Sequence, residues 1–138
     1  MNADRVSLDG LTERIIASAF TIANTLGIGF LEKVYENAMA HELRKRGLSV
    51  EQQRGIVVRY DQIVIGEYTA DLMVDDRVIV ELKVAKSLND QHIAQCVNYL
   101  RATDKPVCLL INFGRPRIEI RRVASGSQPG IDWTAPHR

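Results

Sequence analysis

The segment Val78–Val84 places two charged residues inside an otherwise apolar run, and this feature constrains the fold more than any other in the chain. The run has the length and β-branched composition of a strand. Because side chains alternate along a strand, Glu81 and Lys83 lie side by side on one face, and the other face carries Val78, Val80, Leu82 and Val84. A Glu-x-Lys pair of this kind is most often a solvated strand edge, so its meaning depends on what lies opposite.

The preceding segment, Tyr68–Val74, supplies a candidate partner for Glu81. A turn at Asp75-Asp76-Arg77 would pair Val74 with Val78 and place Asp71 directly across from Glu81, with Cβ atoms about 5 Å apart. Two carboxylates at that distance repel each other unless a cation lies between them. The same alternation predicts that four residues of this strand share the face opposite Asp71, namely Tyr68, Ala70, Leu72 and Val74.

Two neighbouring carboxylates followed by a lysine are the ingredients of a metal-dependent phosphodiester-cleaving site. Mg²⁺ prefers oxygen ligands and commonly takes one or two protein carboxylates. Lys83, two residues beyond Glu81, would orient the attacking water and offset developing negative charge. The spacing alone is a weak signal, and a surface ion pair is its structural alternative.

The remainder of the chain predicts a helical start, a series of strands, one further helix and two last strands. Gly47 stands where a left-handed helix cap is needed, and Asn89 stands where the third helix begins. We expect one domain over residues 1–123 and a flexible tail over 124–138, which lacks periodicity. The predicted helices cover residues 11–26, 31–46 and 89–101, and the predicted strands cover 56–60, 63–65, 68–74, 78–84, 107–112 and 117–123.

The charge balance excludes a broad basic surface, because 18 basic residues face 17 acidic ones and the net charge is +1. Any nucleic-acid site must therefore be local. Arg115, Arg117 and Arg121 are one candidate patch for a phosphate backbone, although a charged strand edge explains them equally well. The two cysteines lack metal spacing and no apolar run is long enough to span a bilayer, so we expect a cytoplasmic protein with no membrane partner.

The stretch Gly29-Phe-Leu-Glu-Lys-Val-Tyr35 resembles the motif after which the GxxExxY proteins are named, a family of the PD-(D/E)XK nuclease superfamily. The resemblance runs from about Leu11 to Val123. It implies an α/β, restriction-endonuclease-like fold, in which a mixed β-sheet is flanked by α-helices. Ala70 stands where the superfamily name has proline. The further matching motifs are Gly66-Glu67-Tyr68, Ala70-Asp71, Val80-Glu81-Leu82-Lys83, Gln95 with Asn98-Tyr99-Leu100, and Asn112-Phe113-Gly114.

The resemblance also implies roles for residues beyond the two strands. Glu32 looks like an extra acid of the metal site, and Gln95 looks like a brace for the site or for the substrate phosphate. Glu32 could equally be a carboxylate that favours the start of its helix. The implied catalytic residues are Asp71, Glu81, Lys83, Gln95 and Glu32, and the implied ligands of Mg²⁺ or Mn²⁺ are Asp71, Glu81, Glu32 and Leu82.

Two functions remain open on these observations. The first is a metal-dependent nuclease that hydrolyses phosphodiester bonds in DNA or RNA. The second is a catalytically inactive module of the same fold that binds nucleic acid or a protein partner, which the small size and near-zero net charge make plausible. The sequence leaves a homodimer open in either case.

Overall fold

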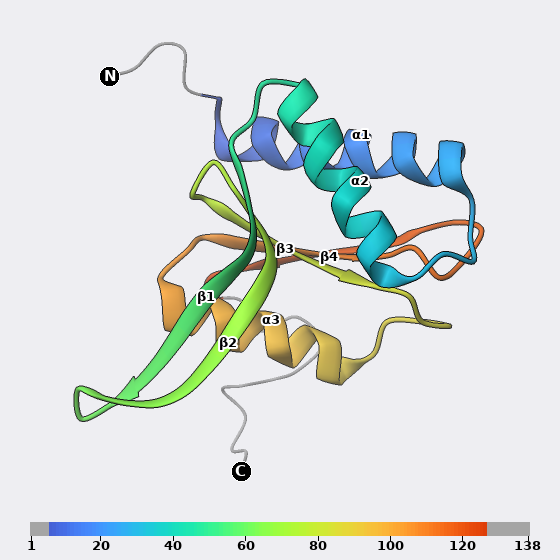
Figure 1. Cartoon of the computed structure of the whole chain (residues 1–138). Helices are drawn as coiled ribbons and strands as arrows, with labels where there is room; N and C mark the ends of the chain where they lie inside the picture. The colour runs from blue at the N-terminus through green and yellow to red at the C-terminus, as the bar shows by residue number, and fades with distance from the viewer. Residues whose placement is uncertain (1–5, 127–138) are drawn as a thin grey trace.

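The computed structural model describes residues 6–126 and arranges them as a sheet between two layers of helices (Figure 1). Helices α1 and α2 lie above the sheet in this view, and α3 lies below it. In chain order the elements are α1 (Leu8–Leu26), α2 (Glu32–Lys45), β1 (Val50–Tyr60), β2 (Ile63–Val74), β3 (Val78–Lys83), α3 (Asp90–Thr103), β4 (Val107–Asn112) and β5 (Glu119–Ala124).

The five strands stand side by side in the order of the sequence. β1–β2, β2–β3 and β4–β5 pair antiparallel, whereas β3 and β4 pair parallel because α3 connects them across one face. A parallel pair requires such a crossover, since a tight turn can only reverse the chain. The predicted mixed sheet flanked by helices is therefore confirmed.

The core consists of two apolar clusters on opposite faces of the sheet, which meet in the fully buried strand β4. Val107, Leu109 and Ile111 pack with α1 and α2, while Cys108 and Leu110 pack with α3. This alternation is the pattern expected of a strand covered on both faces. Both cysteines are buried free thiols.

The largest difference from the predicted elements is the hairpin of β1 and β2, which extends away from α1 and α2 and past α3 as an arm (Figure 1). The predicted strands 63–65 and 68–74 are one strand, because a register shift at Val58/Arg59 absorbs the irregularity between them. The Asp61-Gln62 turn is confirmed, with positive φ at both residues as a tight hairpin requires. β1 begins at Val50, six residues earlier than predicted, because its polar first half pairs through backbone groups.

The expectation that Tyr68, Ala70, Leu72 and Val74 share one face is wrong. Leu72 and Val74 pack with α1 and α2, whereas Ala70 packs with α3 and Tyr68 contacts the ring of Tyr99 on α3. The change of face falls at Asp71, where the pairing of β2 with β3 ends. A strand that leaves its neighbour twists more strongly, and here the twist turns the arm toward α3.

The two predicted helix-boundary residues, Gly47 and Asn89, are confirmed, whereas α1 begins at Leu8, three residues earlier than predicted. Gly47 has φ 88°, and Asn89 caps α3 by accepting the backbone N–H of His92. His92 in turn accepts the backbone N–H of Asn89 through Nδ1, so its role at this position is capping. Within residues 6–126, no helix is long and apolar enough to cross a membrane. Of the predicted tail, Ala124 is the last residue of β5, and residues 127–138 lie outside the described part.

Candidate active site

Asp71 and Glu81 meet where β2 separates from β3. These strands pair through Val74↔Val78, Met73↔Ile79 and Leu72↔Val80, the register that the turn predicted. Beyond Leu72↔Val80 the two strands are joined by hydrogen bonds from backbone N–H groups to side chains. Glu81 Oε2 accepts the N–H of Asp71 at 2.7 Å, and Asp71 Oδ2 accepts the N–H of Leu82 at 2.8 Å. These reciprocal bonds hold both carboxylates at the point where β2 leaves β3. We call this point, with the side chains of Asp71 and Glu81, the fork.

The surroundings of the fork disfavour negative charge on both acids. Glu81 is only 4% exposed, and burial followed by repulsion from Asp71 raises its pKa to about 8. Burial is also the main reason that the pKa of Asp71 is raised, with repulsion from Glu36 adding to it and the Leu82 N–H opposing it. Two acids with raised pKa values at one place are typical of a functional site.

Lys83 lies on the same face of β3 as Glu81 and points toward α3. Its Nζ lies 3.5 Å from Oε1 of Gln95, a long contact that joins the signature strand to that helix. The ammonium is close enough to lower the pKa of both Asp71 and Glu81. Four of the predicted residues, Asp71, Glu81, Lys83 and Gln95, are therefore brought together by three elements. Leu82 has an apolar side chain buried on the opposite face, so only its backbone can serve the site.

Glu32 approaches the fork from the first turn of α2, on the other side of the sheet. Its pKa is raised, first by burial and then by repulsion from Asp71, while Lys83 and the backbone N–H of Val84 lower it. The helix has no side-chain cap at this end. Glu32 thus faces the end of β3 and stands within electrostatic reach of the carboxylate pair.

Sequence reasoning missed two residues that complete the fork, Gln53 on β1 and Glu36 on α2. The Gln53 amide donates to Glu36 Oε1 at 2.8 Å and to Asp71 Oδ1 at 3.4 Å, so it separates two carboxylates that would otherwise face each other. Glu36 is buried and also accepts from Lys33 and Gln52. Gln53 has φ 54°, a backbone conformation that no sequence signal announces for glutamine.

The Asn112-Phe113-Gly114 motif holds the chain that leaves β3. Asn112 accepts the N–H of Ala85 at 3.0 Å and donates to its carbonyl at 2.9 Å, and the Phe113 N–H donates to the Lys83 carbonyl at 2.9 Å. A Cβ on Gly114 would lie 2.4 Å from the Ala85 nitrogen, so only glycine fits. The motif therefore positions the backbone at Lys83.

The donor set at the fork fits a hard divalent cation held by two carboxylates. Glu81 Oε1 receives no N–H from the described residues, and Asp71 Oδ1 receives only the long contact from Gln53. A cation there would offset the repulsion that raises both pKa values. Residues 6–126 contain no ready group of three His, Cys, Asp or Glu side chains for a metal, so the expected set that includes Glu32 is not assembled in this structure. Two carboxylates completed by water suit Mg²⁺.

The arginine patch predicted near the last strand lies away from the fork, at β5 and the loop before it. Arg115 pairs with Glu119 at 3.4 Å, and Arg122 pairs with Asp9 at 3.1 Å. The sheet order places β5 at the edge opposite β1, two strands from β3. Part of this charge is therefore neutralised within the fold.

Comparison with known proteins agrees with this architecture. A family model described as the PD-(D/E)XK nuclease superfamily matches residues 9–123. The solved structure of SSO0001 is similar with a TM-score of 0.53 and 14% identity, and the match covers 85% of this chain and 59% of that one, so the chain spans less than two thirds of that protein. An alkaline exonuclease from Laribacter hongkongensis is similar with a TM-score of 0.52 and 11% identity, over 88% of this chain and 72% of that one. A search of curated proteins found no match.

Proposed function

Because the chain belongs to the PD-(D/E)XK nuclease superfamily, we propose that it hydrolyses phosphodiester bonds in nucleic acid with Mg²⁺ or Mn²⁺. One observation carries this proposal: the fork brings Asp71 and Glu81 into a reciprocal hydrogen-bonded pair with Lys83 beside them. The exonuclease that shares the fold adds a precedent for nucleic-acid cleavage on such a scaffold.

Each side chain has a separate task in the proposed reaction. Asp71 and Glu81 would hold the metal ion, Glu32 would serve as an outer acid, and Leu82 would offer its backbone carbonyl. When bound, the metal ion polarises a phosphoryl oxygen and lowers the pKa of a water molecule. The Lys83 ammonium orients the attacking water and balances negative charge on the phosphate as the bond breaks. Gln95 positions the Lys83 amine through their 3.5 Å contact.

The direct test is a cleavage screen with Mg²⁺, with Mn²⁺ and with a chelator, over single-stranded, double-stranded and branched DNA and over RNA. We expect metal-dependent cleavage of at least one substrate. Lys83→Ala should reduce turnover about 100-fold or more, the scale seen when a charge-stabilising donor is removed, and should keep metal binding.

Lys86→Ala is the matched control for this screen. Lys86 is an exposed lysine three residues further along the chain, and it makes no contact with the fork. Its removal should leave turnover unchanged. Equal activity of Lys83→Ala and the wild type, or no metal-dependent cleavage of any substrate, would contradict the proposal.

A second candidate function is an inactive module that binds nucleic acid or a protein partner. The observation in its favour is that both carboxylates already satisfy backbone N–H groups where two strands part, which is a structural task in itself. The two functions differ in their response to metal. A catalytic fork binds a divalent cation and is stabilised by it, whereas a purely structural fork is not.

The proposal also includes a location and an assembly state. Two buried free thiols favour a reducing compartment, which makes the cytoplasm the expected location. The arm of β1 and β2 exposes several apolar residues, and these could form the interface of a homodimer. Sedimentation of the purified chain checks the second point directly.

A further inference from the structure

The outer half of the arm borders a hollow that neither the fork nor the predicted arginine patch includes. It has a volume of about 520 Å³ and lies between the β1–β2 arm and the C-terminal half of α3. We call it the arm hollow. Its lining consists of residues 57–59 of β1, Tyr68 of β2, and Asn98, Arg101 and Ala102 of α3.

The charge of the arm hollow is positive and unbalanced. Arg59 and Arg101 both line it, and no aspartate or glutamate does. Among residues 6–126, neither guanidinium has an ion-pair or hydrogen-bond partner, whereas Arg54, Arg115 and Arg122 each pair with a carboxylate. In a chain whose net charge is only +1, two unpaired arginines in one hollow form a local site for anionic groups.

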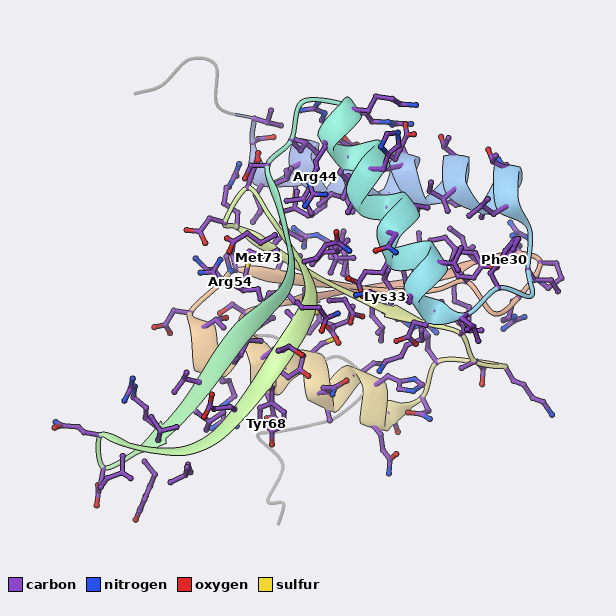
Figure 2. The ribbon with its side chains drawn as sticks, in the orientation of Figure 1. Phe30, Lys33, Arg44, Arg54, Tyr68 and Met73 are labelled. Carbon is purple, nitrogen blue, oxygen red and sulfur yellow. The ribbon has the colours of Figure 1, made fainter. Side chains whose placement is uncertain are left out.

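Tyr68 gives the arm hollow an aromatic surface. Its side chain is 53% exposed, and its ring centroid lies 5.9 Å from that of Tyr99, so the ring is braced on one side and open on the other. Figure 2 shows Tyr68 projecting from β2 beside α3. The change of face at Asp71 is what turns Tyr68 to this side of the sheet. A braced, open tyrosine ring in a hollow that two arginines also line is suited to stacking of an unpaired base.

The arm hollow is close to the fork along two elements. Tyr68 precedes Asp71 by three residues on β2, which corresponds to about 10 Å, or roughly three nucleotides at a stacked rise. Asn98 follows Gln95 by one turn of α3, about 5 Å along the helix. A strand of nucleic acid in the arm hollow would therefore continue into the site at Asp71 and Glu81.

We infer that the arm hollow binds a nucleotide roughly three positions from the scissile bond in a single-stranded nucleic acid, with its unpaired base stacked on Tyr68 and the neighbouring phosphates held by Arg59 and Arg101. This inference rests on the proposed nuclease function and narrows its substrate class. A duplex hides the faces of its bases, so it cannot use the tyrosine ring. The hollow has the volume of a small-molecule pocket, which suits one splayed nucleotide.

The test is binding measured by fluorescence anisotropy in a chelator, so that no cleavage occurs. The probes are labelled single-stranded DNA and RNA of roughly 15 nucleotides and the corresponding blunt DNA duplex. The wild type should bind single strands more tightly than the duplex. Tyr68→Ala should bind single strands about tenfold more weakly, and Tyr68→Phe should bind them as the wild type does, because the ring and not the hydroxyl makes the contact.

Two matched control variants test whether the nucleic acid contacts the arm hollow and not another exposed part of the protein. Phe20 is 46% exposed on α1 and does not line the hollow, so Phe20→Ala should bind like the wild type. Arg59→Ala and Arg101→Ala should each reduce the salt dependence of binding by about 0.7 in log–log slope, while Arg44→Ala, at the end of α2 and outside the hollow, should not. Melting temperatures of all variants verify that each one folds.

The outcomes separate this inference from the proposed function. Tyr68-dependent binding of single strands supports the inference even if no cleavage is found, and the chain is then the binding module. Cleavage that depends on Lys83, combined with normal single-strand binding by Tyr68→Ala, overturns the inference and leaves the nuclease intact. Equal affinity for the duplex, or arginine-dependent binding of polyglutamate with no binding of nucleic acid, also overturns it.

Discussion

Tyr35 stacks on Phe113 with ring centroids 4.7 Å apart and ring planes 9° apart. The Tyr35 hydroxyl donates to the Gly27 carbonyl at 2.6 Å, so one side chain joins α2, the loop after α1 and the end of β4. Phe113 in turn holds the carbonyl of Lys83 through its backbone N–H. The Gly29–Tyr35 motif at the start of α2 and the Asn112–Gly114 motif at the end of β4 therefore pack together and position the backbone at Lys83.

Gly114→Ala tests this packing. The added Cβ would lie 2.4 Å and 2.5 Å from backbone atoms of Ala85, which cannot move without displacing the chain after Lys83. We expect a loss of about 2–3 kcal/mol in the free energy of unfolding, measured by chemical denaturation. Gly55→Ala is the control, because no atom lies within 4 Å of its added Cβ, and it should change stability by less than about 0.5 kcal/mol. Similar losses in both variants would show that Gly114 is not a packing constraint.

Glu81→Gln should flatten the pH dependence of stability in metal-free buffer. The folded-state pKa of Glu81 is about 8 and its ordinary value is 4.5, so between these pH values the folded protein keeps a proton that the unfolded chain has released. Stability therefore falls as pH rises through this window, and the loss is complete above pH 8. The amide of glutamine mimics the protonated acid, so the variant should match the wild type near pH 5 and exceed it by roughly 2 kcal/mol or more near pH 9.

The raised pKa values of Asp71 and Glu32 act in the same direction, so the variant should retain part of the slope. Glu67→Gln provides the comparison, because Glu67 is exposed on the same strand as Asp71. Its stability curve should run parallel to that of the wild type. If Glu81→Gln also runs parallel, Glu81 is ionised in the folded protein and the pKa argument fails.

Metal binding should stabilise the wild type and not Asp71→Asn. A ligand present at ten times its dissociation constant adds about 1.4 kcal/mol, which corresponds to a rise of several degrees in melting temperature for a chain of this size. Asp61→Asn is the matched variant, because Asp61 lies in the turn at the tip of the arm and asparagine tolerates its φ of 52°. A melting temperature of the wild type that does not respond to Mg²⁺ or Mn²⁺ favours the inactive module.

Gln53 allows the backbone and side-chain contributions to be separated. Gln53→Ala removes the amide between Asp71 and Glu36 and keeps the positive φ, whereas Gln53→Gly removes the amide and relieves the backbone. We expect the alanine variant to be less stable than the glycine variant by about 1 kcal/mol. Identical unfolding free energies would mean that the left-handed conformation at this position carries no strain.

Local chemistry explains which parts of the fork could be foreseen. The register Val74↔Val78 follows from a short polar turn between two apolar strands, and the positions of Glu81 and Lys83 follow from alternation within six residues. The start of α3 follows from Asn89. Each of these depends on neighbours in the sequence, where turn and cap preferences are strong.

The remaining features of the fork depend on tertiary geometry, which local sequence patterns do not predict. The side chains of Ala70 and Leu72 lie on different faces because β2 leaves β3 between them, and nothing in the local alternation signals that departure. Gln53 reads as an ordinary polar residue ahead of a strand, yet it lies between two carboxylates supplied by other elements. Glu36 is buried although most glutamates are exposed, so only its partners reveal its role.

The fork also limits how the length of this chain can change in related proteins. Asp71 and Glu81 are ten residues apart, and their contact depends on the three residue pairs of the β2–β3 ladder and the short turn between them. Deleting or inserting a single residue in that span would rotate one carboxylate to the other side of the sheet. The tip of the arm at Asp61-Gln62 carries no such constraint, so we expect natural variation in length to accumulate there.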